Sequence, residues 1–407
     1  MTTATLTSLL LLTLAATLAP LAVDVLGRLV LLPVVVVEIA FGVVLGPDAL
    51  NLVEDDAVVA LLASLGLTLL MFFAGFEIDF ARVRGVPGRL ALLTWGLSLV
   101  VGFSIGFAMH LAGLPDSGLV IGLALTTTAL GVLVPILKDS GESHSVFGVH
   151  VMATGAVGEF GPILAVSLLL GTRAPTRTGL LLLAFAAIAL LAAALAMRPR
   201  PANVSRVVAA TLRTSGQLAV RLTLLIVVAL VWAADELGLD ILLGAFSAGV
   251  VVRLFLSRGD AAEVEVVTDK LEAVGFGFLI PIFFIVSGVR FDLSGLLSST
   301  SALLLLPAIV AMFLVVRGLP VLLVYRSALD GVSRRALALF AASALPLVVV
   351  IANIGVQTGR LEENFAAALV GAAMVSVAVL PLIALRLHRG AGSPSATDPA
   401  NPGRVSG

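Results

Sequence analysis

Apolar residues fill most of the chain in long runs, and short polar stretches separate these runs. A run of about 20 apolar residues is the length that a helix needs to cross the hydrocarbon core of a bilayer. The pattern therefore predicts an all-α integral membrane protein with thirteen transmembrane helices. The predicted spans are residues 6–26, 30–46, 57–77, 89–113, 118–137, 147–170, 178–198, 218–236, 240–256, 270–290, 300–325, 334–357 and 362–388.

Composition supports a membrane protein and excludes several other classes. Of the 407 residues, 60% are hydrophobic and 12% are charged, against about 45–50% and 25% in soluble domains. There are no cysteines, which excludes disulfides and thiol metal sites. No phosphate-binding glycine loop or Ser/His/Asp set stands out, so we expect no enzyme activity, no cofactor and no nucleic-acid partner. Residues 390–407 are rich in Gly, Ser, Pro and Ala and predict a disordered tail.

The positions of the basic residues predict the orientation. If the N-terminus lies outside, 19 of the 24 Lys and Arg residues fall on inner loops or the C-terminal tail. Cytoplasmic loops carry such an excess, so we expect the N-terminus outside and the C-terminus in the cytoplasm. Residues 1–5 contain no Lys or Arg, so residues 6–26 are predicted to be a span and not a cleaved signal peptide.

Two short patterns occur twice, about 210 residues apart. Residues 75–79 and 288–292 share the pattern G-x-[E/R]-x-D after a pair of Phe residues, and residues 38–44 resemble residues 245–251. The two copies are seven spans apart, and an odd shift turns the second copy upside down. We therefore expect inverted repeats at residues 1–170 and 218–389, joined by a connector at 171–217. Inverted repeats are typical of secondary transporters.

Two spans in matching places of the repeats contain helix-breaking residues. A Pro removes a backbone hydrogen bond from a helix, and Thr hydroxyls can meet the backbone groups that a break leaves free. A Pro kink is the simpler interpretation of either break alone, but matching interruptions indicate a transporter's binding site. The predicted breaks are Gly131, Pro135 and Pro346, and the candidate ligands are Thr127, Thr128 and Ser343, with Asn353 as a secondary candidate.

Glu159 and Arg317 are charged residues deep inside predicted spans. A charge at mid-bilayer costs about 2.5–3.5 kcal/mol on insertion scales, so it normally faces protein or water and has a partner. Burial favours a neutral carboxyl and a nearby cation favours the carboxylate. Glu159 can therefore exchange a proton for a metal cation, although a structural carboxylate is the alternative. We expect Arg317 to be its ion-pair partner, because an Arg there stays protonated.

Other charged residues have weaker signals. Glu38 is a deep carboxylate that is either structural or a secondary residue of the ion path. The charges of the two G-x-[E/R]-x-D copies lie at matching span ends, where we expect interfacial or gating contacts. No histidine has metal-ligand spacing, and His144 and His150 are weak candidates for sensing inner pH.

Four stretches resemble the membrane domain of the monovalent cation:proton antiporters of the Kef and sodium/proton exchanger type. They are residues 32–47, 70–79, 243–249 and 281–284. The resemblance implies a core bundle of six helices in which two unwound helices cross, here residues 118–137 and 334–357. It also implies a separate dimerisation bundle, a homodimer and a bacterial cytoplasmic membrane.

The resemblance also implies roles for the two charged residues inside the spans, Glu159 and Arg317. Relatives carry Asp-Asp, Asn-Asp or Gln-Asp where this chain has Gly158-Glu159, so one carboxylate is kept and its polar neighbour is lost. The family's basic residue on the eleventh span corresponds to Arg317. A Lys there is associated with electrogenic exchange in relatives, whereas an Arg does not readily release its proton. We therefore expect electroneutral exchange.

The leading hypothesis is a K⁺/H⁺ or Na⁺/H⁺ antiporter in which the two cations compete for Glu159. One alternative is a proton- or sodium-coupled symporter of a small organic anion. That function needs more basic groups at the crossing than Arg317. A second alternative is a membrane sensor that transports nothing.

Overall fold

The computed structural model describes residues 2–27, 33–78, 83–111, 117–143, 145–169, 175–198, 207, 210–211, 214, 216–257, 261–298 and 300–390. All regular structure in these ranges is helical, as predicted. Eleven helices there are long and apolar enough to cross a membrane, and Val34–Leu45 and Ile241–Leu256 are shorter apolar helices. Together they correspond to the thirteen predicted spans. The predicted disordered tail lies outside the described residues, apart from Gly390.

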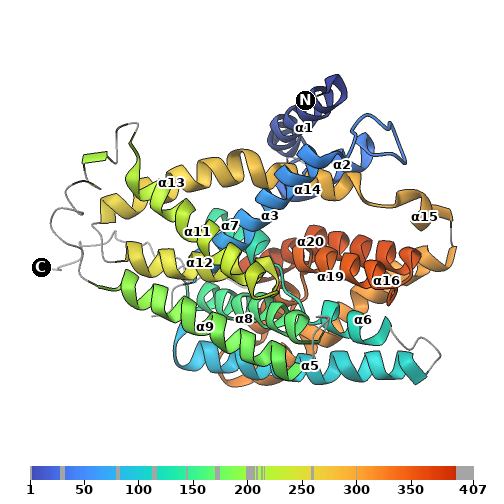
Figure 1. The fold of residues 1–407 in the computed structure, drawn as a ribbon. Helices are drawn as coiled ribbons and strands as arrows, with labels where there is room; N and C mark the ends of the chain where they lie inside the picture. The colour runs from blue at the N-terminus through green and yellow to red at the C-terminus, as the bar shows by residue number, and fades with distance from the viewer. Residues whose placement is uncertain are drawn as a thin grey trace, which may run out of the picture.

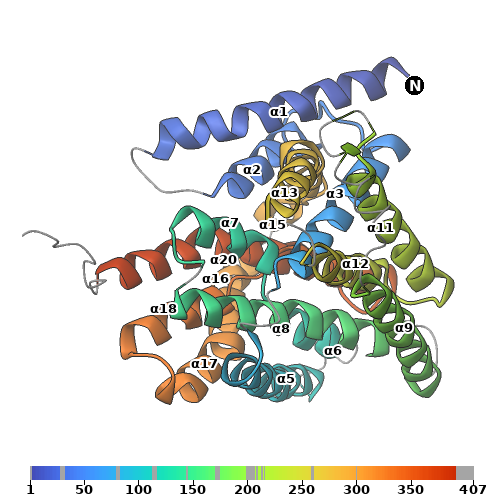
Figure 2. The same ribbon diagram turned by 90° about the vertical axis from the view of Figure 1, so that its left-hand side faces the viewer.

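The helices pack as two bodies (Figures 1 and 2). The first, which we call the panel, contains α1 (Thr3–Gly27), α2 (Val34–Leu45), α3 (Ala57–Phe76), α11 (Leu218–Glu236), α12 (Ile241–Leu256), α13 (Ala261–Val274) and α14 (Ile280–Val289). The second, the core, contains α5 (Val86–Leu111), α6 (Ser117–Leu125), α7 (Leu130–Asp139), α8 (Val146–Leu169), α16 (Thr300–Phe313), α17 (Leu319–Val324), α18 (Gly331–Ala341), α19 (Pro346–Gln357) and α20 (Glu363–Gly390). The connector α9 (Pro175–Ala196) packs on α12 and α8, and α15 (Leu293–Ser298) follows α14.

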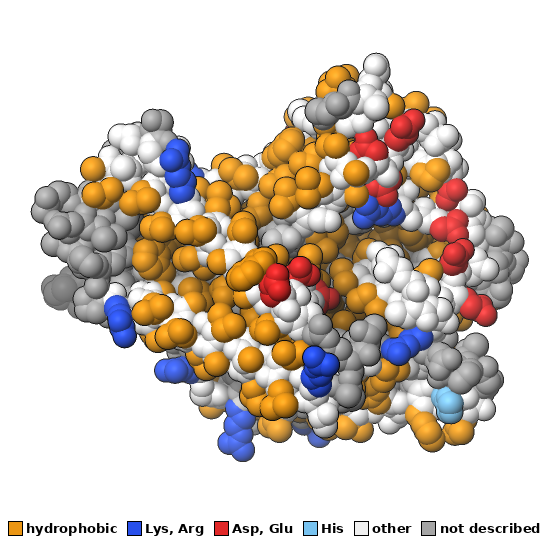
Figure 3. Space-filling model, viewed as in Figure 1, with side chains coloured by type: hydrophobic (Ala, Val, Ile, Leu, Met, Phe, Trp, Pro, Cys, Tyr) orange, Lys and Arg blue, Asp and Glu red, His pale blue; other side chains and the backbone are white. Residues whose placement is uncertain are grey.

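Figure 3 shows apolar side chains over the middle of one face, as lipid contact requires.

The tenth span begins earlier than predicted. The sequence pattern placed it at residues 270–290, whereas α13 starts at Ala261 and continues through a π-helical turn, Gly275–Leu279, into α14. A second π-helical turn, Leu314–Gly318, joins α16 to α17. Such turns are rare inside α-helices and are frequent at functional sites. Each of the two precedes a proline near the start of the next helix, Pro281 or Pro320.

Glycines bring α2 and α14 of the panel into direct backbone contact. A Cβ atom at Gly42 would lie 1.9 Å from the carbonyl oxygen of Ile285, and one at Gly288 would lie 2.1 Å from that of Ile39. Neither position has room for a side chain, because backbone atoms occupy the space.

A second crossing, between α3 and α12, has the same form. A Cβ atom at Gly75 would lie 2.1 Å from the carbonyl oxygen of Phe246, and one at Gly249 would lie 2.0 Å from that of Phe72. All four glycines belong to the patterns that the sequence repeats. At each crossing a glycine from the first half of the chain meets one from the second, as expected if two inverted copies interlock.

Two spans of the core are interrupted. The first breaks at residues 126–129 between α6 and α7, and the second breaks at residues 342–345 between α18 and α19. Pro346 begins α19, where its missing N–H leaves no donor unsatisfied. Gly131 and Pro135, in contrast, lie inside α7, so the prediction that they break the helix was wrong. The break occurs one turn earlier, at the threonines.

Hydrogen bonds stabilise the ends of the interrupted helices. The hydroxyls of Thr126 and Thr127 donate to the carbonyls of Leu123 and Ala124, which end α6. Asp330 caps the start of α18 by accepting from two backbone N–H groups. Hydrogen bonds from the residues that it caps lower the pKa of Asp330 to about 2. The cap is therefore charged at neutral pH, where it favours the N-terminus of the helix.

We predict that Gly42→Ala destabilises the panel. The added methyl group meets the backbone of α14, which cannot move as a side chain can. Overpacking of this kind costs about 1–3 kcal/mol. The melting temperature of the purified protein in detergent measures the effect.

Gly96→Ala is the matched control, because nothing lies within 4 Å of a Cβ atom at Gly96 in α5. Its melting temperature should equal or slightly exceed that of the parent. Equal melting temperatures for the Gly42 and Gly96 variants would contradict the close crossing of α2 and α14.

Candidate functional site

The two interrupted spans meet at their breaks. The backbone N–H of Ala129 donates to the carbonyl of Ser343 at 2.8 Å. The hydroxyl of Thr128 donates to the carbonyl of Ala341 at 2.6 Å. Backbone groups freed by one break therefore bond to groups at the other break, inside the core and away from solvent.

Glu159 lies in α8 beside this crossing, and its side chain is fully buried. Neither carboxyl oxygen has a hydrogen-bond partner among the described residues. The backbone N–H groups of Leu130 and Gly131 approach the carboxyl without completing a hydrogen bond of normal geometry. These groups begin α7, where the helix dipole is positive. An ionised carboxylate without a partner is costly in an apolar interior, so this group favours binding a proton or a cation.

Arg317 is also fully buried, at the π-helical turn before α17. Its Nε and Nη2 atoms both donate to the hydroxyl oxygen of Thr128, at 2.9 and 2.8 Å. Nη1 donates to the hydroxyl of Ser98 at 3.2 Å. Nε and Nη2 also donate, at 3.4 Å each, to the carbonyls of Ala341 and Thr154 respectively. Neutral oxygens therefore surround the guanidinium.

The predicted ion pair between Glu159 and Arg317 does not form in this conformation. The neighbouring residue, Gly158, shows why. A Cβ atom at Gly158 would lie 2.3 Å from Nη2 of Arg317 and 2.7 Å from the hydroxyl oxygen of Thr128. The guanidinium occupies the space that a side chain at position 158 would fill, and Thr128 holds it there. In the sequence analysis, Gly158 was noted only because it replaces the polar residue that relatives carry before the carboxylate.

The predicted oxygen ligands lie at the two breaks. The hydroxyl of Thr127 donates to Ala124 at 2.8 Å, and that of Ser343 donates to Leu339 at 3.1 Å. A hydroxyl that donates keeps lone pairs with which to accept or to coordinate, but the hydroxyl of Thr128 already accepts twice from Arg317. A role in ion binding therefore stays a prediction for the hydroxyls of Thr127 and Ser343 and for the backbone carbonyl of Thr128.

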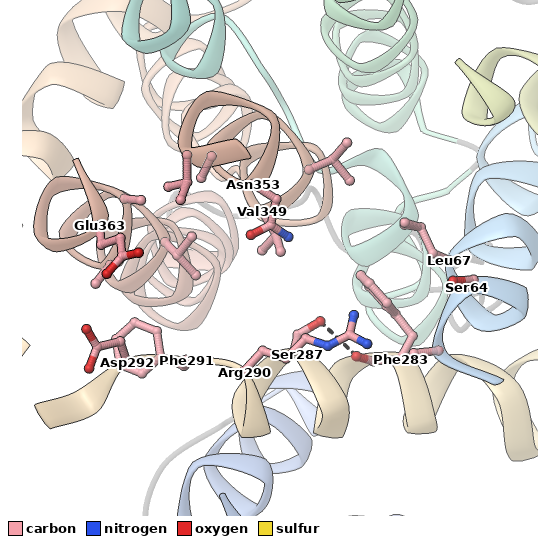
Figure 4. A pocket seen from close by; sticks show the side chains of 17 residues that line it. Ser64, Leu67, Phe283, Ser287, Arg290, Phe291, Asp292, Val349, Asn353 and Glu363 are labelled. Carbon is pink, nitrogen blue, oxygen red and sulfur yellow. Dashed lines mark hydrogen bonds between the residues drawn. The ribbon is translucent and has the colours of Figure 1, made fainter. Parts of the chain in front are cut away.

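Other candidate residues lie away from the crossing. Glu38 is buried in α2 of the panel. Asn353 lines a separate cavity of about 360 Å³ between the panel and the core (Figure 4). His150 is buried in α8, and its ring packs edge-on against Tyr325. Asp79 and His144 lie outside the described residues.

Sequence reasoning missed several polar residues of the core. Ser98 and Thr154 contact Arg317, and the hydroxyl of Thr154 lies 2.8 Å from that of Tyr325. Ser376 of α20 accepts from the backbone N–H of Ala344 at 3.1 Å, which supports the second break. No motif marks these residues. The signal that the sequence offers is a Ser or Thr within an otherwise apolar span.

A multi-pass membrane protein whose interrupted spans cross beside a buried carboxyl belongs to the class of ion-coupled transporters. The comparison with protein families agrees. The transmembrane region of the sodium/hydrogen exchanger family matches residues 12–387, and the chain belongs to this family.

Known relatives and solved structures agree with the family assignment. The chain is 29% identical to YjbQ of Bacillus subtilis, named as an Na⁺/H⁺ antiporter, over 88% of this chain and 59% of YjbQ. It is 24% identical to the Na⁺/H⁺ antiporter of Enterococcus hirae, over 86% of this chain and 91% of that one. The structure of MjNhaP1, a sodium/proton antiporter of Methanocaldococcus jannaschii, matches with a TM-score of 0.67 at 17% identity, over 93% and 95% of the two chains. The fold is therefore shared.

We predict that Thr128→Val destabilises the core by removing the acceptor of two guanidinium hydrogen bonds. A buried donor left unsatisfied costs roughly 1–3 kcal/mol, and more when it is charged. Thr126→Val is the control, because the hydroxyl of Thr126 bonds only within its own helix turn. Melting temperatures of the purified variants provide the comparison.

A double-mutant cycle with Arg317→Met isolates the interaction. Thr128→Val should cost less in the Arg317→Met background, since no guanidinium remains to be satisfied. An equal cost in both backgrounds would contradict the assignment of Thr128 as the residue that holds Arg317.

Proposed function

We propose that the protein exchanges a monovalent cation, Na⁺ or K⁺, for H⁺, with the two ions competing for Glu159. The observation that carries this proposal is the fully buried carboxyl without a hydrogen-bond partner beside the crossing. The names of the relatives support the cation class, since they include Na⁺/H⁺ antiporters and the Na⁺/H⁺-K⁺ antiporter GerN of Bacillus cereus.

Competition follows from the electrostatics of a buried acid. In a low-dielectric site the carboxylate is stable only with a positive charge beside it. A bound proton removes the charge and a bound alkali ion compensates it, so binding of one excludes the other. Oxygen atoms at the breaks, including the hydroxyl of Thr127 and the backbone carbonyl of Thr128, replace the hydration shell of the ion.

Alternating access requires the core to move relative to the panel. Each body has extensive internal packing, whereas the direct contacts between them are few and are made chiefly by α3 with α7, α8 with α12 and α2 with α20. The core carries Glu159 and both breaks, so a rigid-body motion of the core moves the complete site.

Electroneutral exchange follows if Glu159 alone changes its charge. Arg317 is bound by neutral oxygens and stays protonated in a protein. One proton then exchanges for one monovalent cation in each cycle.

The symporter alternative has little support. The comparisons give it none, and an organic anion needs free donors at the crossing. The three guanidinium nitrogens of Arg317 already donate to protein oxygens.

The orientation and assembly are further parts of the proposal. The distribution of Lys and Arg supports an N-terminus outside and a C-terminus in the cytoplasm of a bacterial inner membrane. We also propose a homodimer, formed through the panel so that the core remains free to move.

We predict that Glu159→Gln abolishes exchange, because an amide neither releases a proton nor compensates a cation. Purified protein in liposomes with an acidic interior should show dequenching of a pH-sensitive dye on addition of Li⁺, Na⁺, K⁺ or Rb⁺, in an order that reports selectivity. The variant should show only the background of empty liposomes.

Glu362→Gln is the matched control, since Glu362 is an exposed carboxylate just before α20. It should retain the parent's rate. In addition, a potential imposed with K⁺ and valinomycin should leave the rate of Na⁺ exchange by the parent protein unchanged. Activity of Glu159→Gln at the parent's level would refute the role of Glu159, and a rate that follows the potential would refute electroneutrality.

A further inference from the structure

One lysine joins the core to the panel. Lys138 lies in the last turn of α7, and its Nζ atom is 2.5 Å from Oε1 of Glu77 and 3.1 Å from Oε1 of Glu272. Glu77 ends α3 and Glu272 lies in α13, so both carboxylates belong to the panel. We call these three residues the Lys138 cluster.

A cavity separates the two bodies elsewhere. It is the cavity of about 360 Å³ named above, and it lies between α3 and α14 of the panel and α19 and α20 of the core. Figure 4 shows Ser287 and Arg290 on one side of it, with Asn353 and Glu363 on the other. Glu159 does not line the cavity and stays buried.

The cavity and the Lys138 cluster lie toward opposite ends of the same helices. Along α3, Ala63 lines the cavity and Glu77 is in the cluster, fourteen residues later. Along the continuous helix from α13 to α14, Glu272 precedes Ser287 by fifteen residues. At 1.5 Å per residue both separations are about 21–23 Å. Both helices therefore show the same arrangement: the panel and the core are apart at one end and joined by ion pairs at the other.

We propose that the Lys138 cluster is a latch that keeps the two bodies together at the end predicted to face the cytoplasm, and that it must break before the cavity can close. The inference rests on the proposed alternating-access function, and it adds Lys138, Glu77 and Glu272 as residues that set the balance between the two states. None of them contacts the transported ion.

The strength of the latch suits this role. All three side chains are partly exposed, and exposed ion pairs contribute little individually. Two carboxylates on one ammonium form a contact that thermal motion can open. Loss of the latch should therefore shift the ratio of the two states by roughly threefold to tenfold.

The absence of cysteine from the chain makes the test direct. Ser287→Cys places a thiol of nearly the same size on the cavity wall. The protein is placed in nanodiscs, where reagent reaches both ends, and the rate of labelling by a bulky maleimide reports the open cavity. Adding Lys138→Gln should slow labelling by as much as about threefold to tenfold, the full factor being reached when the open state is the minor one, because the cavity is then open for less of the time.

Two controls separate the latch from general effects. Arg335→Gln removes a cation from α18 that donates to the carbonyl of Gly331 in its own helix, and it should not change the rate. A thiol at Ala49, an exposed residue outside the cavity lining, should label equally fast with and without Lys138→Gln.

Variants of the partners complete the test. Glu77→Gln with Glu272→Gln should slow labelling as Lys138→Gln does, and Lys138→Glu with Glu77→Lys should restore much of the rate lost in Lys138→Glu alone. Labelling that is unchanged or faster in the Lys138→Gln and the Glu77/Glu272 variants would overturn the proposal. Labelling needs no ion flux, so this result is independent of whether Glu159→Gln abolishes exchange.

Discussion

The buried carboxyl of Glu159, which has no hydrogen-bond partner among the described residues, is the constraint on which the rest of the account depends. Glu159 is fully enclosed, and the nearby guanidinium of Arg317 is bound by Thr128 and Ser98 instead. Gly158 makes this arrangement possible, because any side chain there would displace the guanidinium. The carboxyl of Glu159 therefore lacks a partner, which a proton or a cation can supply. All three nitrogens of the Arg317 guanidinium, in contrast, already donate to protein oxygens. This difference is the basis of the proposal that Glu159 exchanges the ions while Arg317 keeps its positive charge.

The rest of the fold positions that carboxyl and allows it to move. Glycines hold α2 against α14 and α3 against α12 through backbone contact, so the panel has little freedom to deform. The core holds both breaks, and hydrogen bonds between them make the site one unit. The two bodies meet at a buried apolar cluster of α3, α7, α8 and α12 and at the Lys138 cluster, and share fewer contacts than each has within itself. Two rigid bodies with a limited interface are what a rocking motion requires.

Much of this could be predicted from the sequence, because a membrane imposes simple rules. Span length and the interest of Glu159 follow from the cost of polar groups in lipid, and the repeated patterns indicated two copies, although the close contacts that their glycines make appear only in the structure. The partner of Arg317 could not be predicted, since it depends on which side chain fills the space beside Gly158. Pro135 was also misleading, because α7 continues through it and the span is interrupted at residues 126–129 instead. Helix-breaking propensity therefore predicted the wrong residues for this break, although it predicted the right span.

The most direct test of the central claim is to count protons released when a cation binds. Purified protein in weakly buffered detergent solution is titrated with Na⁺ and with K⁺ near neutral pH, and a pH indicator reports the release. A carboxyl shared by two competing ions predicts release approaching one proton per bound cation when the site starts protonated, and none from Glu159→Gln. Cation binding without proton release at any pH, or equal release from the variant, would contradict the account.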